Sequence, residues 1–203
     1  MKIRIPEDYS DITVRQYKKL IQAWDEEKDT KKVALKSISI LCDVDEETVQ
    51  RIDWSDIEGV IKDIGWLLAE PDPTKLNLPL QKTFTLNGTQ YGFIPDWTKL
   101  SVGEFADLET YCSEGAYKNL ESILAVVYRK VTKQVGKDYS IDDYSPHPQK
   151  NEAMLECPMD VAVSAMVFFY HIGRKLAQDT KRFLQAQMEA KPPRYTRNGG
   201  GTA

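Results

Sequence analysis

The sequence predicts a mainly α-helical protein of the α+β class, in which a helical bundle packs on a two-stranded antiparallel ribbon. Asn87-Gly88, between two short alternating runs, predicts the ribbon, because Asn-Gly best accommodates the two positive φ angles of a type I′ turn. Capping-box sequences followed by apolar residues at helical spacing predict the helices.

Four helices are expected in residues 1–73. Thr13 to Gln16 is a capping-box sequence that begins the first helix, which should end within the polar residues 25–29. A second helix covers about 30–42, and a short third begins near Asp45. Ser55 to Glu58 is a further capping-box sequence, and its helix should end before residues 70–73, where two prolines disfavour helix in the residues that precede them.

The predicted hairpin spans residues 83–93 and has an apolar face. A two-residue turn places Phe84 opposite Tyr91 and Leu86 opposite Thr89, so that Phe84, Leu86, Tyr91 and Phe93 share one side. An isolated hairpin is marginal in water. We therefore expect this face to lie against helices.

Three more helices are expected after the hairpin. Ser101 to Glu104 is a third capping-box sequence, and the helix that follows has Phe105, Leu108 and Cys112 on one face. Residues 116–132 are expected to form the next helix, followed by a polar loop over 133–157. The last helix should run from Pro158 to about residue 190 and be buried all round from residue 161 to 172, where nearly every side is apolar.

These elements predict a single domain over 1–190, with a helical part at 1–73 and the hairpin with its helices at 80–190. Residues 191–203 hold two prolines, three glycines, three basic residues and no acid, which is typical of a flexible tail. Such a tail is either a solvated end or a segment that becomes ordered on a partner.

Composition excludes several classes of function. The net charge of −4 argues against non-specific nucleic-acid binding, which needs a basic surface. The longest apolar run, residues 162–170, is about half of what a bilayer span needs, and the first ten residues lack the apolar region of a secretion signal. Three isolated cysteines, Cys42, Cys112 and Cys157, predict buried, reduced thiols and a cytoplasmic protein.

No combination of residues predicts catalysis, a cofactor or a metal. Asp43, Asp45 and Glu47 alternate like the first ligands of a calcium loop, but Thr48 and Trp54 stand where such a loop needs glycine and glutamate. The two histidines, at positions 147 and 171, have no partners at zinc-binding or triad spacing. We therefore expect a protein that acts by binding and is not an enzyme.

From residue 83 to 184 the order of segments resembles small structural and assembly proteins of tailed bacteriophages. The segments are FTLNGTQYGFI, LSVGEFADLETY, NLESILAVVYRKV, DYSIDDY and AMVFFYHIGRKL. The tail assembly chaperones are the class that these segments resemble most. The resemblance implies a non-enzymatic protein that binds a helical tape-measure protein and tail-tube subunits in the host cytoplasm during assembly. The alternative that stays open is a virion structural protein of the head–tail connector, neck or tail.

Partner contacts are expected where apolar or basic surface exceeds what one core can hide. We predict them on the last helix and on the tail, at Phe168, Phe169, Ile172, Lys191, Arg194, Tyr195 and Arg197. The implied partners are other phage structural proteins: the tape measure, the tail tube or connector subunits. A homo-oligomer stays open, and neither a membrane nor nucleic acid is expected as a partner.

Overall fold

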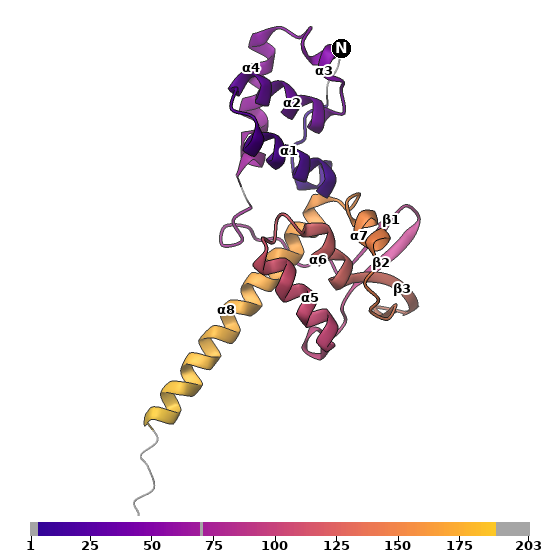
Figure 1. Cartoon of the computed structure of the whole chain (residues 1–203). Helices are drawn as coiled ribbons and strands as arrows, with labels where there is room; N and C mark the ends of the chain where they lie inside the picture. Colours follow the sequence, from indigo (N-terminus) through magenta and orange to yellow (C-terminus); the bar gives the residue numbers. More distant parts are fainter. Residues whose placement is uncertain (1–3, 70, 190–203) are drawn as a thin grey trace, which may run out of the picture. The chain divides into compact units, whose positions relative to one another are not determined.

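A computed structural model describes residues 4–69 and 71–189 (Figure 1). The chain divides into two compact units, Met1–Val167 and Phe168–Ala203. The helices are α1 (Val14–Glu26), α2 (Thr30–Cys42), α3 (Glu46–Val49), α4 (Trp54–Ile64), α5 (Val102–Ser113), α6 (Leu120–Val127), α7 (Pro148–Met154) and α8 (Met159–Glu189), which begins in the first unit and continues into the second. The strands are β1 (Thr83–Leu86), β2 (Thr89–Phe93), β3 (Tyr128–Val135) and β4 (Asp138–Ile141), and short 3-10 helices cover Tyr9–Asp11, Gly65–Leu68 and Trp97–Lys99.

The mixed α+β class is confirmed, and so are the first three predicted helices. Thr13 forms both bonds of the capping box at α1, and Asp45 caps α3. The capping box predicted at Ser55 is wrong. α4 begins at Trp54 without a side-chain cap, and the Glu58 carboxylate instead accepts a hydrogen bond from the Trp54 indole at 2.6 Å.

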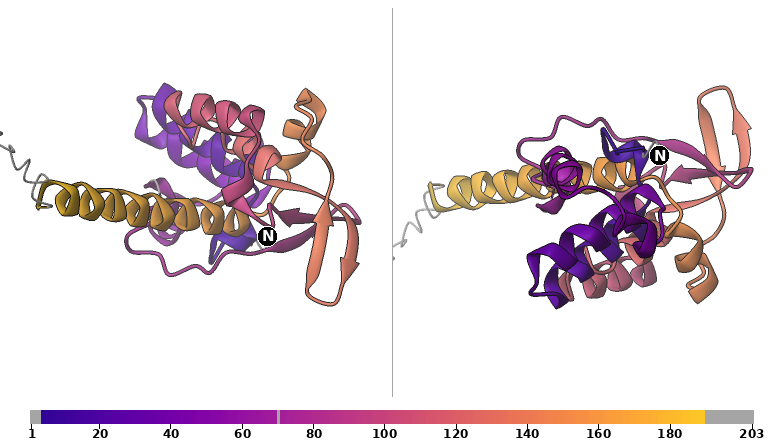
Figure 2. Two further views of the ribbon diagram at one scale, coloured as in Figure 1. Left: turned by 90° about the horizontal axis from the view of Figure 1, so that it is seen from below. Right: turned by 90° about the horizontal axis from the view of Figure 1, so that it is seen from above.

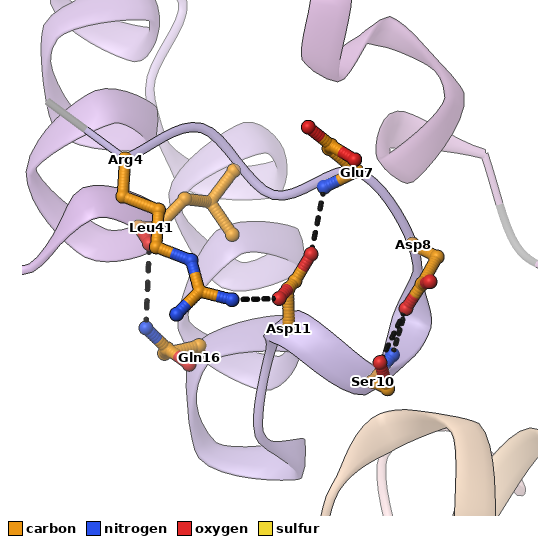
Figure 3. A network of polar contacts seen from close by, with 7 residues as sticks. All are labelled: Arg4, Glu7, Asp8, Ser10, Asp11, Gln16 and Leu41. Atoms are coloured by element: carbon orange, nitrogen blue, oxygen red, sulfur yellow. Dashed lines mark hydrogen bonds and ion pairs between the residues drawn. The ribbon is translucent and has the colours of Figure 1, made fainter.

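Polar contacts fold the segment before α1 (Figure 3). The Asp11 carboxylate accepts hydrogen bonds from the Arg4 guanidinium at 2.5 Å and from the backbone N–H of Glu7 at 3.0 Å. The Gln16 amide of α1 donates to the backbone carbonyls of Ile40 at 3.1 Å and Leu41 at 3.5 Å, and so fastens α1 to the end of α2. A cluster of buried apolar residues then joins α2, α3 and α4, namely Ala34, Ile38, Val49 and Ile57.

The hairpin has the predicted register. Phe84 pairs with Tyr91 and Leu86 with Thr89, and both turn residues have positive φ, 49° at Asn87 and 75° at Gly88. The Phe84 ring stacks on Tyr91 at 5.4 Å between centroids and meets the edge of Tyr128 at 5.2 Å. Phe84 and Tyr91 remain half-buried, so the apolar face is covered only in part.

The predicted two-stranded ribbon is wrong in extent, because β1 and β2 belong to a four-stranded antiparallel sheet of order β1-β2-β3-β4. The helix predicted over 116–132 ends at Val127, and the chain continues from Tyr128 as β3. A strand at this position is favoured because the free edge of β2 supplies hydrogen bonds, with Phe93 paired to Tyr128 and Tyr91 to Lys130.

The predicted polar loop over 133–157 also contains regular structure. β3 turns into β4 through Gly136, whose φ is 62°, and Val135 pairs with Asp138 across the turn. α7 follows and packs on α6, where the Asn151 amide donates a hydrogen bond to the Ser122 hydroxyl at 3.1 Å. Figure 2 shows the β3–β4 hairpin extending away from β1 and β2.

The last helix is confirmed from Met159 to Glu189, but its burial is narrower than predicted. Residues 161–165 and Val167 are buried, whereas Phe168 to Tyr170 are half-buried and His171 is exposed. The cysteines also differ from expectation. All three are free, but only Cys157 is buried, while Cys42 is half-buried and Cys112 is exposed.

Candidate protein-interaction surface

Two of the three most exposed large apolar side chains of the described residues lie on α5. Val102 is 88% exposed and Phe105 is 60% exposed. Ala106, Glu109 and Cys112 lie on the same side of the helix by their spacing and are also exposed. These five residues, Val102, Phe105, Ala106, Glu109 and Cys112, are called the α5 outer face below.

The inner side of α5 carries the acids Glu104 and Asp107 beside the half-buried Leu108 and Tyr111. Glu104 is the fully buried residue of the helix, and its carboxylate forms an ion pair of 2.7 Å with Arg129 of β3. One turn later, the Asp107 carboxylate accepts a hydrogen bond from the Tyr144 hydroxyl. The Arg129 guanidinium also lies 5.9 Å from the centre of the Tyr144 ring. α5 therefore buries a charged residue and leaves Val102 and Phe105 outward, whereas a usual surface helix turns its large apolar side chains inward.

Local sequence explains where α5 begins. The Ser101 hydroxyl accepts from the backbone N–H of Glu104 at 3.3 Å, and the Glu104 carboxylate accepts from the backbone N–H of Ser101 at 2.6 Å. This capping box places the Glu104 carboxylate at the start of the helix, where Arg129 can reach it. Successive residues of a helix are rotated about its axis. Val102, two residues before Glu104, and Phe105, one residue after it, are therefore turned away from the inner side.

The electrostatics of Glu104 fix it in the ionised form. Burial alone would raise the pKa of Glu104, but the Ser101 N–H and hydroxyl together with Arg129 outweigh burial and lower it below the ordinary value of 4.5. Burial raises the pKa of Tyr144, and the hydrogen bond to Asp107 raises it further. The support beneath α5 is therefore a charged carboxylate and a neutral phenol at neutral pH.

The outer face also carries one acid, Glu109, and no base. α5 contains Glu104, Asp107 and Glu109, and no lysine or arginine occurs from residue 100 to 117. Glu104 is neutralised by Arg129, whereas Glu109 is exposed. A surface of this kind fits a partner segment that has an apolar stripe flanked by basic side chains.

The predicted partner residues on α8 stay predictions. Phe168, Phe169 and Ile172 are half-buried, and the two phenylalanine rings meet edge to face at 5.5 Å within the second unit. Lys191, Arg194, Tyr195 and Arg197 lie outside the described residues. The α5 outer face was missed because Phe105, Leu108 and Cys112 were assigned to one face. Phe105 and Cys112 lie on the exposed side, and Leu108 lies on the half-buried side beside Glu104.

Within residues 4–69 and 71–189, no group of three or more His, Cys, Asp or Glu side chains is placed to hold a metal ion. No helix of this same part of the chain is both long and apolar enough to cross a membrane. No family model, curated protein or solved structure matches the chain.

Proposed function

We propose that this protein is a non-catalytic assembly factor that binds a helical segment of a partner on the α5 outer face. In the setting that the sequence resemblance implies, it is a phage tail assembly chaperone. Its partner is then a tape-measure-type helical protein, bound in the host cytoplasm together with tail-tube subunits. The observation that carries the proposal is the outward placement of Val102 and Phe105 on a helix that is fixed from within by the buried Glu104–Arg129 ion pair.

The energetics of the exposed side chains favour a partner. An exposed apolar side chain adds no hydrophobic stabilisation to the folded chain. Full burial of a large one in a contact with a partner contributes about 1.5–3 kcal/mol to binding. Aromatic side chains often dominate such contacts. A long tape-measure protein exposes apolar helical stripes before assembly, and a rigid helix with an apolar face offers one of these stripes a place to pack.

The test is co-expression of the chain with the tape-measure-type protein of the same phage, followed by measurement of the soluble fraction and of the complex. Phe105→Asp should abolish the complex, because it places a charge at the centre of the α5 outer face. The matched control is Val135→Asp, at an apolar residue that is 65% exposed on β3. We expect the control to retain the complex and both variants to keep the thermal stability of the parent.

Equal complex formation by Phe105→Asp and the parent would reject the α5 outer face as the binding site. A partner that stays insoluble with the unaltered chain would reject the chaperone role itself. Stoichiometric amounts of the protein in purified particles, together with that result, would instead support the permanent structural component of the connector, neck or tail.

A further inference from the structure

A pocket of about 420 Å³ lies between the sheet and the helix pair α6 and α7. Its walls come from β2, β3, α6, the segment after β4 and α7. The Asn151–Ser122 hydrogen bond and the packing of α7 on α6 fix one wall, and the β2–β3 pairing fixes the other. This volume falls within the range typical of small-molecule sites.

One part of the pocket lining is apolar and aromatic. Tyr91, Tyr128 and Met154 are the large apolar or aromatic residues of the lining, and Tyr91 is the most exposed of the three. The Tyr128 hydroxyl already donates to the backbone carbonyl of Gln81 at 2.7 Å, and the Tyr91 ring is held by stacking on Phe84. These two rings therefore present fixed walls against which an apolar or aromatic body can pack.

The other part of the lining is basic. Arg129, Lys130 and Lys150 line the pocket together with one acid, Asp142. Neither lysine forms an ion pair with another side chain of the described residues. With Arg129 neutralised by its ion pair with Glu104, the two lysines and Asp142 leave a net charge of +1 on the lining, although the whole chain carries −4.

Arg129 also supplies a donor that lacks an acceptor. Its side chain is 12% exposed, and its Nε atom is buried without a hydrogen-bond partner among the described residues. A buried donor that forms no hydrogen bond is costly. Because this atom has no exposed surface, a ligand acceptor can reach it only after the Arg129 side chain shifts toward the pocket.

We propose that the pocket between β2, β3, α6 and α7 binds a monoanionic carboxylate joined to an apolar or aromatic body. The carboxylate lies toward Arg129, Lys130 and Lys150, and the body packs on Tyr91 and Met154. Two sources present this chemistry: the C-terminal residue of a polypeptide and a free aryl or alkyl carboxylate. The site is separate from the α5 outer face and does not depend on the proposed function.

The test is a titration of the full chain with N-acetylphenylalanine and with 4-phenylbutyrate, followed by backbone amide shifts in NMR spectra. We expect saturable binding with shifts gathered at residues 125, 129 and 153, and at least tenfold weaker binding of the neutral N-acetylphenylalanine amide. Binding by both acids indicates any carboxylate of this type, whereas binding by N-acetylphenylalanine alone indicates a polypeptide C-terminus.

Substitution of the two pocket lysines tests whether their positive charge is needed for carboxylate binding. Lys130→Gln with Lys150→Gln should weaken binding about tenfold or more, a change of roughly 1.4 kcal/mol or more in binding free energy. The control, Lys133→Gln with Lys137→Gln, removes the same charge from exposed positions around the turn of the same hairpin and should leave binding unchanged.

Three results would overturn the assignment. They are the absence of saturable binding for both acids, equal binding of the neutral amide, and tighter binding of phenyl phosphate than of either carboxylate. Phe105→Asp should leave this binding unchanged, so that failure here and failure of the proposed function are separate outcomes.

Discussion

At the scale of single residues, the ion pair between Glu104 and Arg129 holds α5 with Glu104 inward and Phe105 outward. The two side chains are 7% and 12% exposed, so both charges have lost most of their water. Desolvation makes such pairs expensive to form, but removal of one partner is worse, because it leaves the other charge buried and alone. The main effect of the pair is therefore to determine which side of α5 faces inward, and its contribution to net stability is small.

We predict that Arg129→Met lowers the free energy of unfolding by about 3–5 kcal/mol, because the Glu104 carboxylate stays buried without its partner. Urea denaturation at pH 7 measures this change. Glu104→Gln combined with Arg129→Met should recover most of the loss, since glutamine keeps the capping box with Ser101 and carries no charge. A double variant as unstable as Arg129→Met alone would contradict the role given to the buried charge.

The pH dependence gives a second readout of the same pair. The pKa of Glu104 is lower in the folded chain than its ordinary value of 4.5, so its contribution to stability is present above pH 4.5 and is lost as pH falls through the folded pKa. The parent should therefore lose this stability below pH 4.5. The double variant, which has no carboxylate at position 104, should lack this part of the acid dependence.

At the scale of elements, a close approach at Gly92 fixes how β4 lies over the sheet. The Tyr139 ring of β4 covers Gly92 of β2, and a Cβ atom on Gly92 would lie 2.5 Å from Cε2 of Tyr139. The ring cannot move freely, because its hydroxyl donates to the backbone carbonyls of Phe93 at 2.8 Å and Lys82 at 3.1 Å. Glycine at position 92 thus permits β2 and β4 to meet.

We predict that Gly92→Ala destabilises the chain by about 1–3 kcal/mol, the usual cost of overpacking. Chemical denaturation measures this, and Gly59→Ala in α4 is the control. A Cβ there meets nothing within 4 Å, so alanine should raise stability by about 0.5–1 kcal/mol through its helix propensity. In a Tyr139→Leu background the cost of Gly92→Ala should shrink, and an unchanged cost would rule out the ring as its cause.

Elements with local signals could be predicted from the sequence, and those that depend on distant partners could not. Asn87-Gly88 and the Thr13 and Ser101 capping boxes each act within a few residues, and all three are present in the structure. β3 was missed because its first residues continue the apolar run of α6, and only pairing with β2 makes them a strand. The β3–β4 turn carried a local signal, glycine at position 136, that sequence reasoning did not use.

The candidate site was missed for the same reason. Which side of α5 faces inward depends on Arg129, which is far along the chain and lies on a strand that was not predicted. Apolar spacing alone favours Phe105 and Cys112 as inward residues, yet both are exposed. Tertiary ion pairs can overrule a helical apolar pattern, and no local rule reveals when they do so.

At the scale of the first compact unit, the segment around α1 closes the fold against the residues just before α8. Thr13 forms a β-bridge with Pro158, and the backbone N–H groups of Val14 and Arg15 donate to the carbonyls of Cys157 at 3.0 Å and Leu155 at 2.8 Å. The Lys18 ammonium adds an ion pair of 2.6 Å with Glu121 of α6. Residues more than 100 positions apart are thus joined by hydrogen bonds and an ion pair.

This closure predicts opposite outcomes for deletions at the two ends of the chain. Deletion of residues 1–26 removes, among other buried residues, the large side chains of Ile12, Val14, Tyr17 and Leu20. Each contributes about 1.5–3 kcal/mol, and their sum approaches the whole stability of an ordinary domain, about 5–15 kcal/mol. Thermal unfolding followed by circular dichroism should therefore show no cooperative transition for this deletion. Deletion of residues 191–203, which have no apolar pattern, should leave the parent transition in place. If the shortened N-terminal form instead unfolds cooperatively within a few degrees of the parent, the closure by residues 12–18 does not hold the unit together.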